Sequence, residues 1–116
     1  MTAWDAIRWI DDKQHNVYSV EDKLKWLSQV EAMACRLKER CGIPSESREV
    51  EPQTELSVPE PYDGLYLRYL EAQIHYANGE YDRYNNAITV FNDNLAGYRG
   101  EVARTYQPKE HARFRF

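Results

Sequence analysis

The sequence is poor in the residues and segments that build disulfide frameworks, metal centres and membrane spans. Its 116 residues include 2 cysteines and 3 histidines. It has no long uncharged apolar run, and its mean hydropathy is -0.80, which excludes a membrane-spanning helix. The first twenty residues carry several aspartates and lack the apolar stretch of a signal peptide. We therefore expect a protein that is made and kept in cytosol-like conditions, with no membrane partner.

The two cysteines are not expected to form a disulfide with each other. Cys35 and Cys41 fall on one predicted helix, about 9 Å apart along its axis and pointing roughly 120° apart around it. A bridge between them would require the helix to unravel. Because the sequence also lacks a C-x-x-C motif, we expect two reduced and unreactive thiols.

Motifs for catalysis and for cofactor binding are missing as well. The histidines are scattered at His15, His75 and His111, with no H-x-x-x-H pair. The 5 glycines form neither of the two glycine-rich loops that cradle phosphates. Glu71 and His75 are one helical turn apart and could share a metal ion or a proton, although an ordinary hydrogen bond is the simpler interpretation. We expect no enzyme activity, no metal site and no cofactor.

Charge is distributed unevenly along the chain, although the net charge is only -4. Residues 43–63 carry six carboxylates and one arginine, and residues 107–116 carry three lysine or arginine residues and one glutamate. For each segment alone, a solvated loop or terminus is the simpler interpretation. Together, two flexible segments of opposite charge suit contacts with partner proteins. The residues predicted to bind partners are Glu49, Glu51 and Glu55 in the acidic segment, and Arg113, Phe114, Arg115 and Phe116 in the tail.

Hydrophobic periodicity predicts an all-α protein, a small bundle of about four helices in one domain that covers residues 1–106. The first helix covers about residues 2–12 after a Thr2 cap, and the second begins after Ser19 and stops at Gly42. Four prolines exclude a helix between the second and third helices. Residues 43–61 are therefore expected to form a long acidic loop or extended segment, with at most one or two short strands. The expected apolar side of the first helix is Trp4, Ile7, Trp9 and Ile10, and that of the second is Leu24, Leu27, Val30, Ala34, Leu37 and Cys41.

The second half of the chain predicts a C-terminal αα-hairpin. Its helices cover about residues 62–78 and 81–105, and a short turn at Gly79 joins them. The first of these helices is apolar on nearly every side, so it is central or is shared between the core and a partner. Residues 107–116 follow as a flexible basic and aromatic tail. The apolar stripe of the last helix is Tyr84, Ile88, Phe91, Leu95, Tyr98 and Val102, and Gly97 and Gly100 within it mark a bend or a close contact.

Tyrosine is concentrated in the hairpin. Six of the 9 tyrosines lie between Tyr62 and Tyr84, interleaved with Arg68, Arg83 and two asparagines. This combination is typical of protein interfaces. Core packing accounts for about half of these tyrosines. Stacking of single-stranded bases is a further interpretation, but it fits badly with the carboxylates in the same stretch. We add Arg68 and Arg83 to the predicted partner-binding residues.

The run VPEPYDGLYLRYLEAQIHYANGEYDRYNNAITVFN, residues 58–92, resembles small proteins encoded by tailed phages and prophages of Gram-positive bacteria. The start of the chain fits too, with AIRWI at residues 6–10 and KLKWL at residues 23–27. Proteins of this kind are grouped with head-tail connector, or head-completion, proteins. The resemblance covers most of residues 3–106. The positions that carry it in the longer run are Pro59, Pro61, Tyr62, Asp63, Tyr69, Leu70, Asp82, Tyr84, Asn85, Asn86 and Phe91.

This resemblance implies a virion structural protein, an all-helical adaptor of the head-tail neck. Such an adaptor docks in multiple copies on the portal ring, contacts the portal protein and other neck proteins, and forms a homo-oligomeric ring. Genomic DNA passes through that ring without sequence-specific binding, and the protein resides in the host cytoplasm during assembly. The alternative is a small soluble helical interaction module that regulates a partner and does not enter the virion.

Residues 43–61 and 107–116 are expected to be mobile in the free protein and ordered in the assembled particle. The reason is that neither segment is expected to bury enough apolar surface to offset about 1–2 kcal/mol of entropy for each ordered residue.

Overall fold

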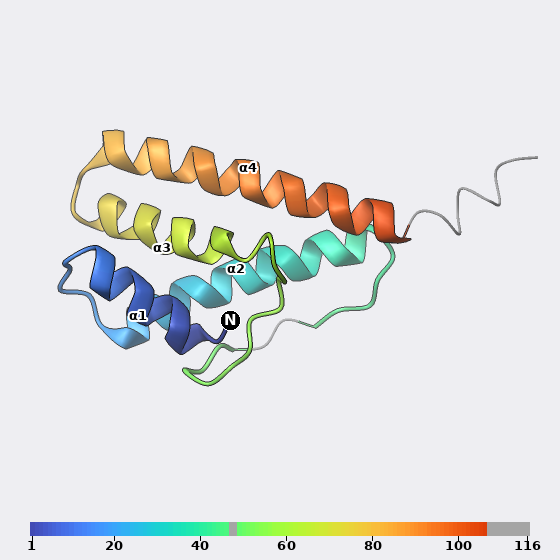
Figure 1. Cartoon of the computed structure of the whole chain (residues 1–116), viewed down its shortest axis with the longest axis horizontal. Coiled ribbons are helices and arrows are strands. Elements are labelled where there is room, and N and C mark those ends of the chain that lie inside the picture. Colours follow the sequence, from blue (N-terminus) through green and yellow to red (C-terminus); the bar gives the residue numbers. More distant parts are fainter. Residues whose placement is uncertain (47–48, 107–116) are drawn as a thin grey trace, which may run out of the picture.

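A computed structural model describes residues 1–46 and 49–106, and within them the fold is all-α, as predicted. The described residues form helices α1 (Ala3–Lys13), α2 (Val20–Arg40), α3 (Gly64–Ala77) and α4 (Tyr81–Tyr106). The β-pairing among these residues is limited to an isolated antiparallel bridge between Thr2 and Glu55. Figure 1 shows α4 lying along α3, with α1 on the other side of α3. The predicted tail, residues 107–116, lies outside the described residues.

Helix α1 begins at a capping box, because the Thr2 hydroxyl accepts from the Asp5 N–H and the Asp5 carboxylate accepts from the Thr2 N–H. Its buried face differs from the predicted one. The tryptophans flank this face, since Trp4 is 43% exposed and Trp9 is only partly buried. Small alanines on the inward side let α1 approach its neighbours closely, and this leaves no room there for the larger rings. The buried residues are Ala3, Ala6, Ile7 and Ile10.

Helix α2 has the predicted start and end. The Ser19 hydroxyl accepts from the Asp22 N–H at 3.1 Å, and Gly42 adopts a φ of 82°, the left-handed conformation that favours glycine after a helix. Its apolar stripe is buried, with Leu24 and Cys41 partly exposed at the ends. Lys23 is buried beside the stripe, where its ammonium donates to the Asp11 carboxylate at 2.6 Å and to the Tyr18 carbonyl at 3.0 Å. This cation therefore fixes the connection between α1 and α2.

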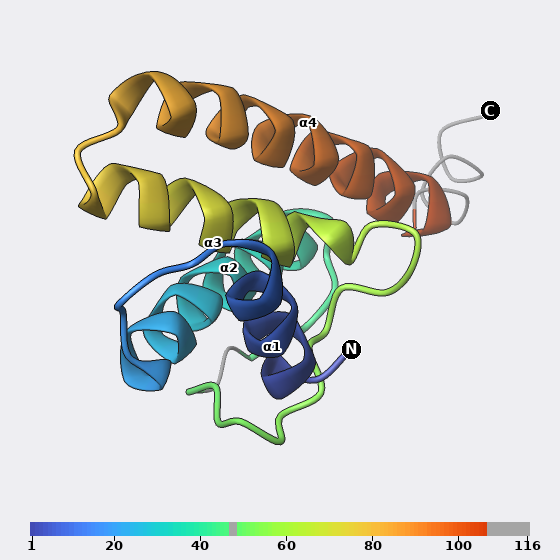
Figure 2. The ribbon, with the colours of Figure 1, turned by 60° about the vertical axis from the view of Figure 1, so that its left-hand side comes forward.

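Helix α3 is the central element, because it packs against α1, α2 and α4 (Figure 2). It begins at Gly64 rather than at the predicted residue 62, since a turn that joins the Tyr62 N–H to the Pro59 carbonyl precedes it. Gly79, with a φ of 78°, makes the tight turn into α4. On α4 the predicted stripe faces α3. A Cβ at Gly97 would be in van der Waals contact with the Tyr62 ring, at 3.4 Å, whereas a Cβ at Gly100 would have no neighbour within 4 Å, so the close contact predicted for these glycines is absent at Gly100.

The proline-rich segment between α2 and α3 is built into the core. Its described residues bury Val50, Leu56 and Val58, each 5% exposed or less. The premise that this segment cannot bury enough apolar surface is therefore wrong. The apolar residues alternate with exposed carboxylates, so an extended backbone turns the first inward and the second outward.

Backbone hydrogen bonds join the same segment to the first turn of α1. The N–H of Ala3 donates to the Thr54 carbonyl at 2.9 Å, the N–H of Trp4 to the Pro52 carbonyl at 2.8 Å, and the N–H of Leu56 to the Met1 carbonyl at 2.9 Å. The first two bonds satisfy N–H groups that a helix start leaves without partners. The segment and α1 therefore form one surface.

A cluster of hydrogen bonds around the Tyr66 hydroxyl ties the segment to α2 and α3. The hydroxyl donates to the Glu31 carboxylate on α2 and accepts from the Val58 N–H at 2.8 Å. The second oxygen of Glu31 accepts from the Ser57 N–H at 3.1 Å. Burial and the nearby carboxylate raise the pKa of Tyr66 well above its usual value, so the hydroxyl remains a donor.

Replacing Phe91 tests the core between α3 and α4. Phe91 is 2% exposed and its ring centroid lies 4.9 Å from that of Tyr69. We expect Phe91→Ala to lower the free energy of unfolding by about 3 kcal/mol, through lost burial and the cavity that remains. Urea titration measures this change. Val90→Ala, at a neighbouring position that is 41% exposed, should change the stability by about 0.5 kcal/mol or less. Equal effects of the two variants would contradict the assignment of the stripe.

Replacing Tyr66 tests the hydroxyl cluster. Tyr66→Phe leaves the buried Val58 N–H without its acceptor, so we expect a loss of about 1–3 kcal/mol in urea titration. Tyr69→Phe is the matched control, because Tyr69 is also buried but its hydroxyl donates to Gln29, an exposed residue that water can serve instead. We expect a smaller loss, about 0.5 kcal/mol. A Tyr69→Phe loss equal to or above that of Tyr66→Phe would refute the role given to the cluster.

Candidate functional site

The hairpin brings Arg68 and Arg83, the two predicted partner-binding arginines, to one pocket. Arg68 lies on α3 and Arg83 on α4, and both line a cavity of about 240 Å³ between the helices. The sequence separates these residues, and the antiparallel turn at Gly79 places them together. The pocket is lined by Arg68, Glu71, His75, Arg83, Asn86, Ala87 and Val90.

Carboxylates partly balance the positive charge of this pocket. Arg68 pairs with Glu71 at 3.3 Å, which replaces the predicted contact between Glu71 and His75. His75 Nδ1 lies 3.2 Å from Glu80, which also accepts from Arg83 at 3.2 Å. The hydrogen bond with His75, followed by one from Asn78, lowers the pKa of the Glu80 carboxyl below its usual value. The surface therefore offers both signs of charge, which suits a polar protein surface better than a polyanion.

Three tyrosines gather at the turn of the same hairpin. The Tyr76 ring lies 5.6 Å from that of Tyr81 and 5.1 Å from that of Tyr84, both edge to face. Tyr76 is 55% exposed and Tyr81 59% exposed. Tyr66 and Tyr69, in contrast, are buried. The tyrosines of the hairpin are therefore divided between the core and the surface, as the sequence predicts.

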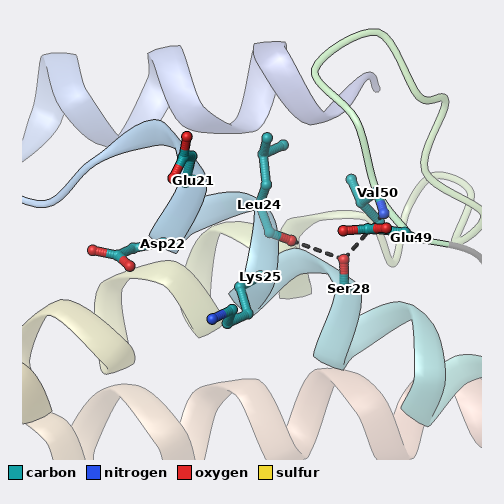
Figure 3. Close-up of a pocket in the computed structure, with 7 residues that line it drawn as sticks. All are labelled: Glu21, Asp22, Leu24, Lys25, Ser28, Glu49 and Val50. Atoms are coloured by element: carbon teal, nitrogen blue, oxygen red, sulfur yellow. Dashed lines mark hydrogen bonds between the residues drawn. The ribbon is translucent and has the colours of Figure 1, made fainter.

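Glu49 lies at a second pocket, between the proline-rich segment and the start of α2 (Figure 3). The Ser28 hydroxyl accepts from the Val50 N–H at 3.1 Å and donates to the Leu24 carbonyl at 2.9 Å, which holds the backbone next to Glu49 against α2. In Figure 3 the Lys25 ammonium points away from the Glu49 carboxylate. This cavity of about 410 Å³ is lined by Glu21, Asp22, Leu24, Lys25, Ser28, Glu49 and Val50.

Glu51 and Glu55 lie elsewhere, beside the start of α1. The Glu55 carboxylate pairs with the N-terminal ammonium at 2.8 Å, and this hydrogen bond raises the pKa of that ammonium. Glu51 accepts from the Gln53 amide at 3.3 Å. A shallow, mostly apolar pocket of about 490 Å³ lies at the start of α1 and is lined by Thr2, Trp4, Pro52 and Gln53. The structure thus divides the predicted acidic residues between two surfaces.

The predicted tail residues Arg113, Phe114, Arg115 and Phe116 lie outside the described residues. Within residues 1–46 and 49–106, no group of three or more histidine, cysteine or acidic side chains is arranged to hold a metal ion. No helix in this part of the chain is long and apolar enough to cross a membrane. Cys35 and Cys41 are both free thiols.

Sequence reasoning missed the exposure of Trp4 and the pocket that it lines. The signal was present, because Ala3, Ala6, Ile7 and Ile10 form a complete helical face without either tryptophan. The large side chains of Trp4 and Trp9 lie next to this face in the helical repeat and obscure it in the sequence.

Comparisons with known proteins assign no function to this chain. No protein-family model matches the chain, and neither a curated protein nor a solved structure matches it significantly.

The charge network at the hairpin turn predicts a dependence of stability on pH. The folded pKa of Glu80 is lowered, so its stabilising effect is complete above the unfolded value and is lost as the pH falls through the folded value. We therefore expect Glu80→Gln to lower the melting temperature more at about pH 6 than at about pH 3. Thermal unfolding followed by circular dichroism measures both.

Asp82→Asn is the control, because it removes a negative charge from the same turn and leaves the contacts of Glu80 intact. The prediction fails if Glu80→Gln has the same effect at both pH values, or a larger one in acid.

Proposed function

We propose that this protein is an adaptor that binds other proteins in the head-tail neck of a tailed phage, as a structural component of the virion. The observation that carries the proposal is the α3–α4 hairpin, which brings Arg68 and Arg83 to one pocket and exposes Tyr76 and Tyr81 at its turn. Arginine and tyrosine are the residues that most often supply binding energy at protein interfaces. The resemblance of residues 58–92 supports the phage context.

The hairpin suits this task because its shape is fixed before any partner binds. The stripe of α4 packs against the central helix α3, and the turn at Gly79 sets the distance between the helices. A preformed surface loses little conformational entropy on binding. The proposed partners are the portal protein and other neck proteins, with further copies of the chain completing a ring.

Electrostatics supports a passive relation to DNA. The net charge is -4, and the pocket near Glu49 carries three carboxylates and one lysine. Such surfaces release few counterions from phosphates and therefore do not hold the duplex. Genomic DNA would pass through a ring of these subunits without sequence-specific contacts.

Complementation of a phage that lacks this protein tests the proposal. We expect the wild-type chain to be present in multiple copies in purified virions, and Arg68→Glu with Arg83→Glu to reduce the yield of tailed particles at least about tenfold, because the interface loses two anchors. Electron microscopy and plaque counts measure this yield. Arg99→Glu, at an exposed position on α4 outside the pocket, is the matched control and should complement fully.

Absence of the protein from purified virions would refute the virion role. It would favour the alternative, a helical interaction module that regulates a partner without entering the particle.

A further inference from the structure

The pocket beside Trp4 has a large aromatic surface that the fold does not cover. Trp4 is 43% exposed, and its backbone N–H donates to the Pro52 carbonyl at 2.8 Å. This bond holds the first turn of α1 and the proline-rich segment in a fixed relation, so both walls of the pocket are preformed. A tryptophan in such a position is a typical anchor for a partner side chain.

The rim of this pocket is acidic. Glu51 precedes Pro52 in the chain and is exposed, and Asp5 follows Trp4 and is also exposed. Glu55, 70% exposed at its side chain, lies across the bridge from Thr2. Two cations lie in the same region: Arg8, exposed one turn further along α1, and the N-terminal ammonium, which pairs with Glu55 at 2.8 Å. Glu51 and Asp5 are therefore the carboxylates that keep the region acidic. An occupant should therefore combine an apolar ring with positive charge.

We propose that the pocket beside Trp4 binds the C-terminal segment Arg113–Phe116 of a second copy of this chain. This segment alternates arginine and phenylalanine, so when it is extended the two rings lie on one side and the two guanidinium groups on the other. A phenylalanine packs against Trp4 and Pro52. The long arginine side chains reach the rim, where they pair with Glu51 and Asp5.

The arrangement of the helices favours binding of the segment from a second copy over binding of the segment from the same chain. Helix α4, which ends at Tyr106, packs mainly against α3, whereas α1 packs against α2 and α3. Figures 1 and 2 both show α4 on one side of α3 and α1 on the other. The last described residue of α4 and the first turn of α1 therefore belong to elements on opposite sides of α3. A segment that follows one of these elements and binds the other in a second copy generates head-to-tail contacts, which close into a ring or extend into a filament.

This inference rests on the proposed adaptor function and adds to it the contact between copies of the chain. Its test needs no phage. A chain that is absent from virions could still bind its own tail, and a chain that is present in virions could fail to do so. The two proposals therefore fail separately.

The experiment uses the full chain with Phe114→Ala and Phe116→Ala, labelled with ¹⁵N, and a synthetic peptide of residues 107–116. We expect the peptide to shift the indole N–H signal of Trp4 in a saturable way and to leave the signals of Trp9 and Trp26 unchanged. A peptide with both phenylalanines replaced by alanine should bind at least about tenfold more weakly. Glu51→Lys in the labelled chain should also weaken binding, with no change in the circular dichroism spectrum.

Sedimentation of the wild-type chain then distinguishes a second copy from the same chain. We expect association that rises with concentration and is lost in Trp4→Ala but kept in Tyr81→Ala, a control that removes another exposed aromatic side chain. No shift of the Trp4 signal by the peptide would overturn the proposal. A chain that stays monomeric at all concentrations, while its Trp4 signal still depends on Phe114 and Phe116, would overturn it too, because the tail would then bind its own chain.

Discussion

The hydroxyl of Tyr66 is the contact on which the arrangement of the molecule most depends. It lies at the meeting point of three segments: α3, which carries it, α2, which supplies Glu31, and the proline-rich segment, which supplies the Val58 N–H. The second carboxylate oxygen of Glu31 holds the Ser57 N–H. A buried polar cluster of this kind is costly unless every member has a partner, and no buried side-chain nitrogen or oxygen among the described residues lacks one.

Both surfaces near the proline-rich segment follow from that anchor. Val58 and Leu56 are fixed in the core, so the chain before them is led back across the start of α1, where Pro52 and Thr54 accept from its first N–H groups. This path places Pro52 and Gln53 at the Trp4 pocket, with Glu51 next to them in the chain. The bond from Val50 to Ser28 places Glu49 at the start of α2 instead. The hairpin pocket with Arg68 and Arg83 is set independently, by the turn at Gly79 and the packing of α4 on α3.

The local features of the fold were predictable because local chemistry determines them. Ser19 and Gly42 mark the ends of α2, since a hydroxyl cap and a left-handed residue each act within one turn. The stripe of α4 was predictable from spacing alone. The start of α3 was not, because the turn at Pro59 and Tyr62 competes with an otherwise helical pattern.

The packing of the proline-rich segment was predicted wrongly, and the reason is instructive. Prolines and carboxylates correctly exclude a helix there, but they do not exclude burial, and Val50, Leu56 and Val58 supply the apolar side chains. The partners that fix the segment lie on other elements, Ser28 and Glu31 on α2 and Tyr66 on α3, so no pattern within the segment reveals them. The shared pocket of Arg68 and Arg83 was predictable from the sequence, because an antiparallel hairpin with a short turn places its two helices side by side.

Native-state hydrogen exchange of the full-length chain tests most directly whether the proline-rich segment is part of the core. The amides of Val50, Leu56 and Val58 all donate to partners within the fold. They should therefore exchange with protection of the same order as the amides in the middle of α3. Exchange of these three amides at the rate of an unstructured peptide, while α3 remains protected, would contradict this account.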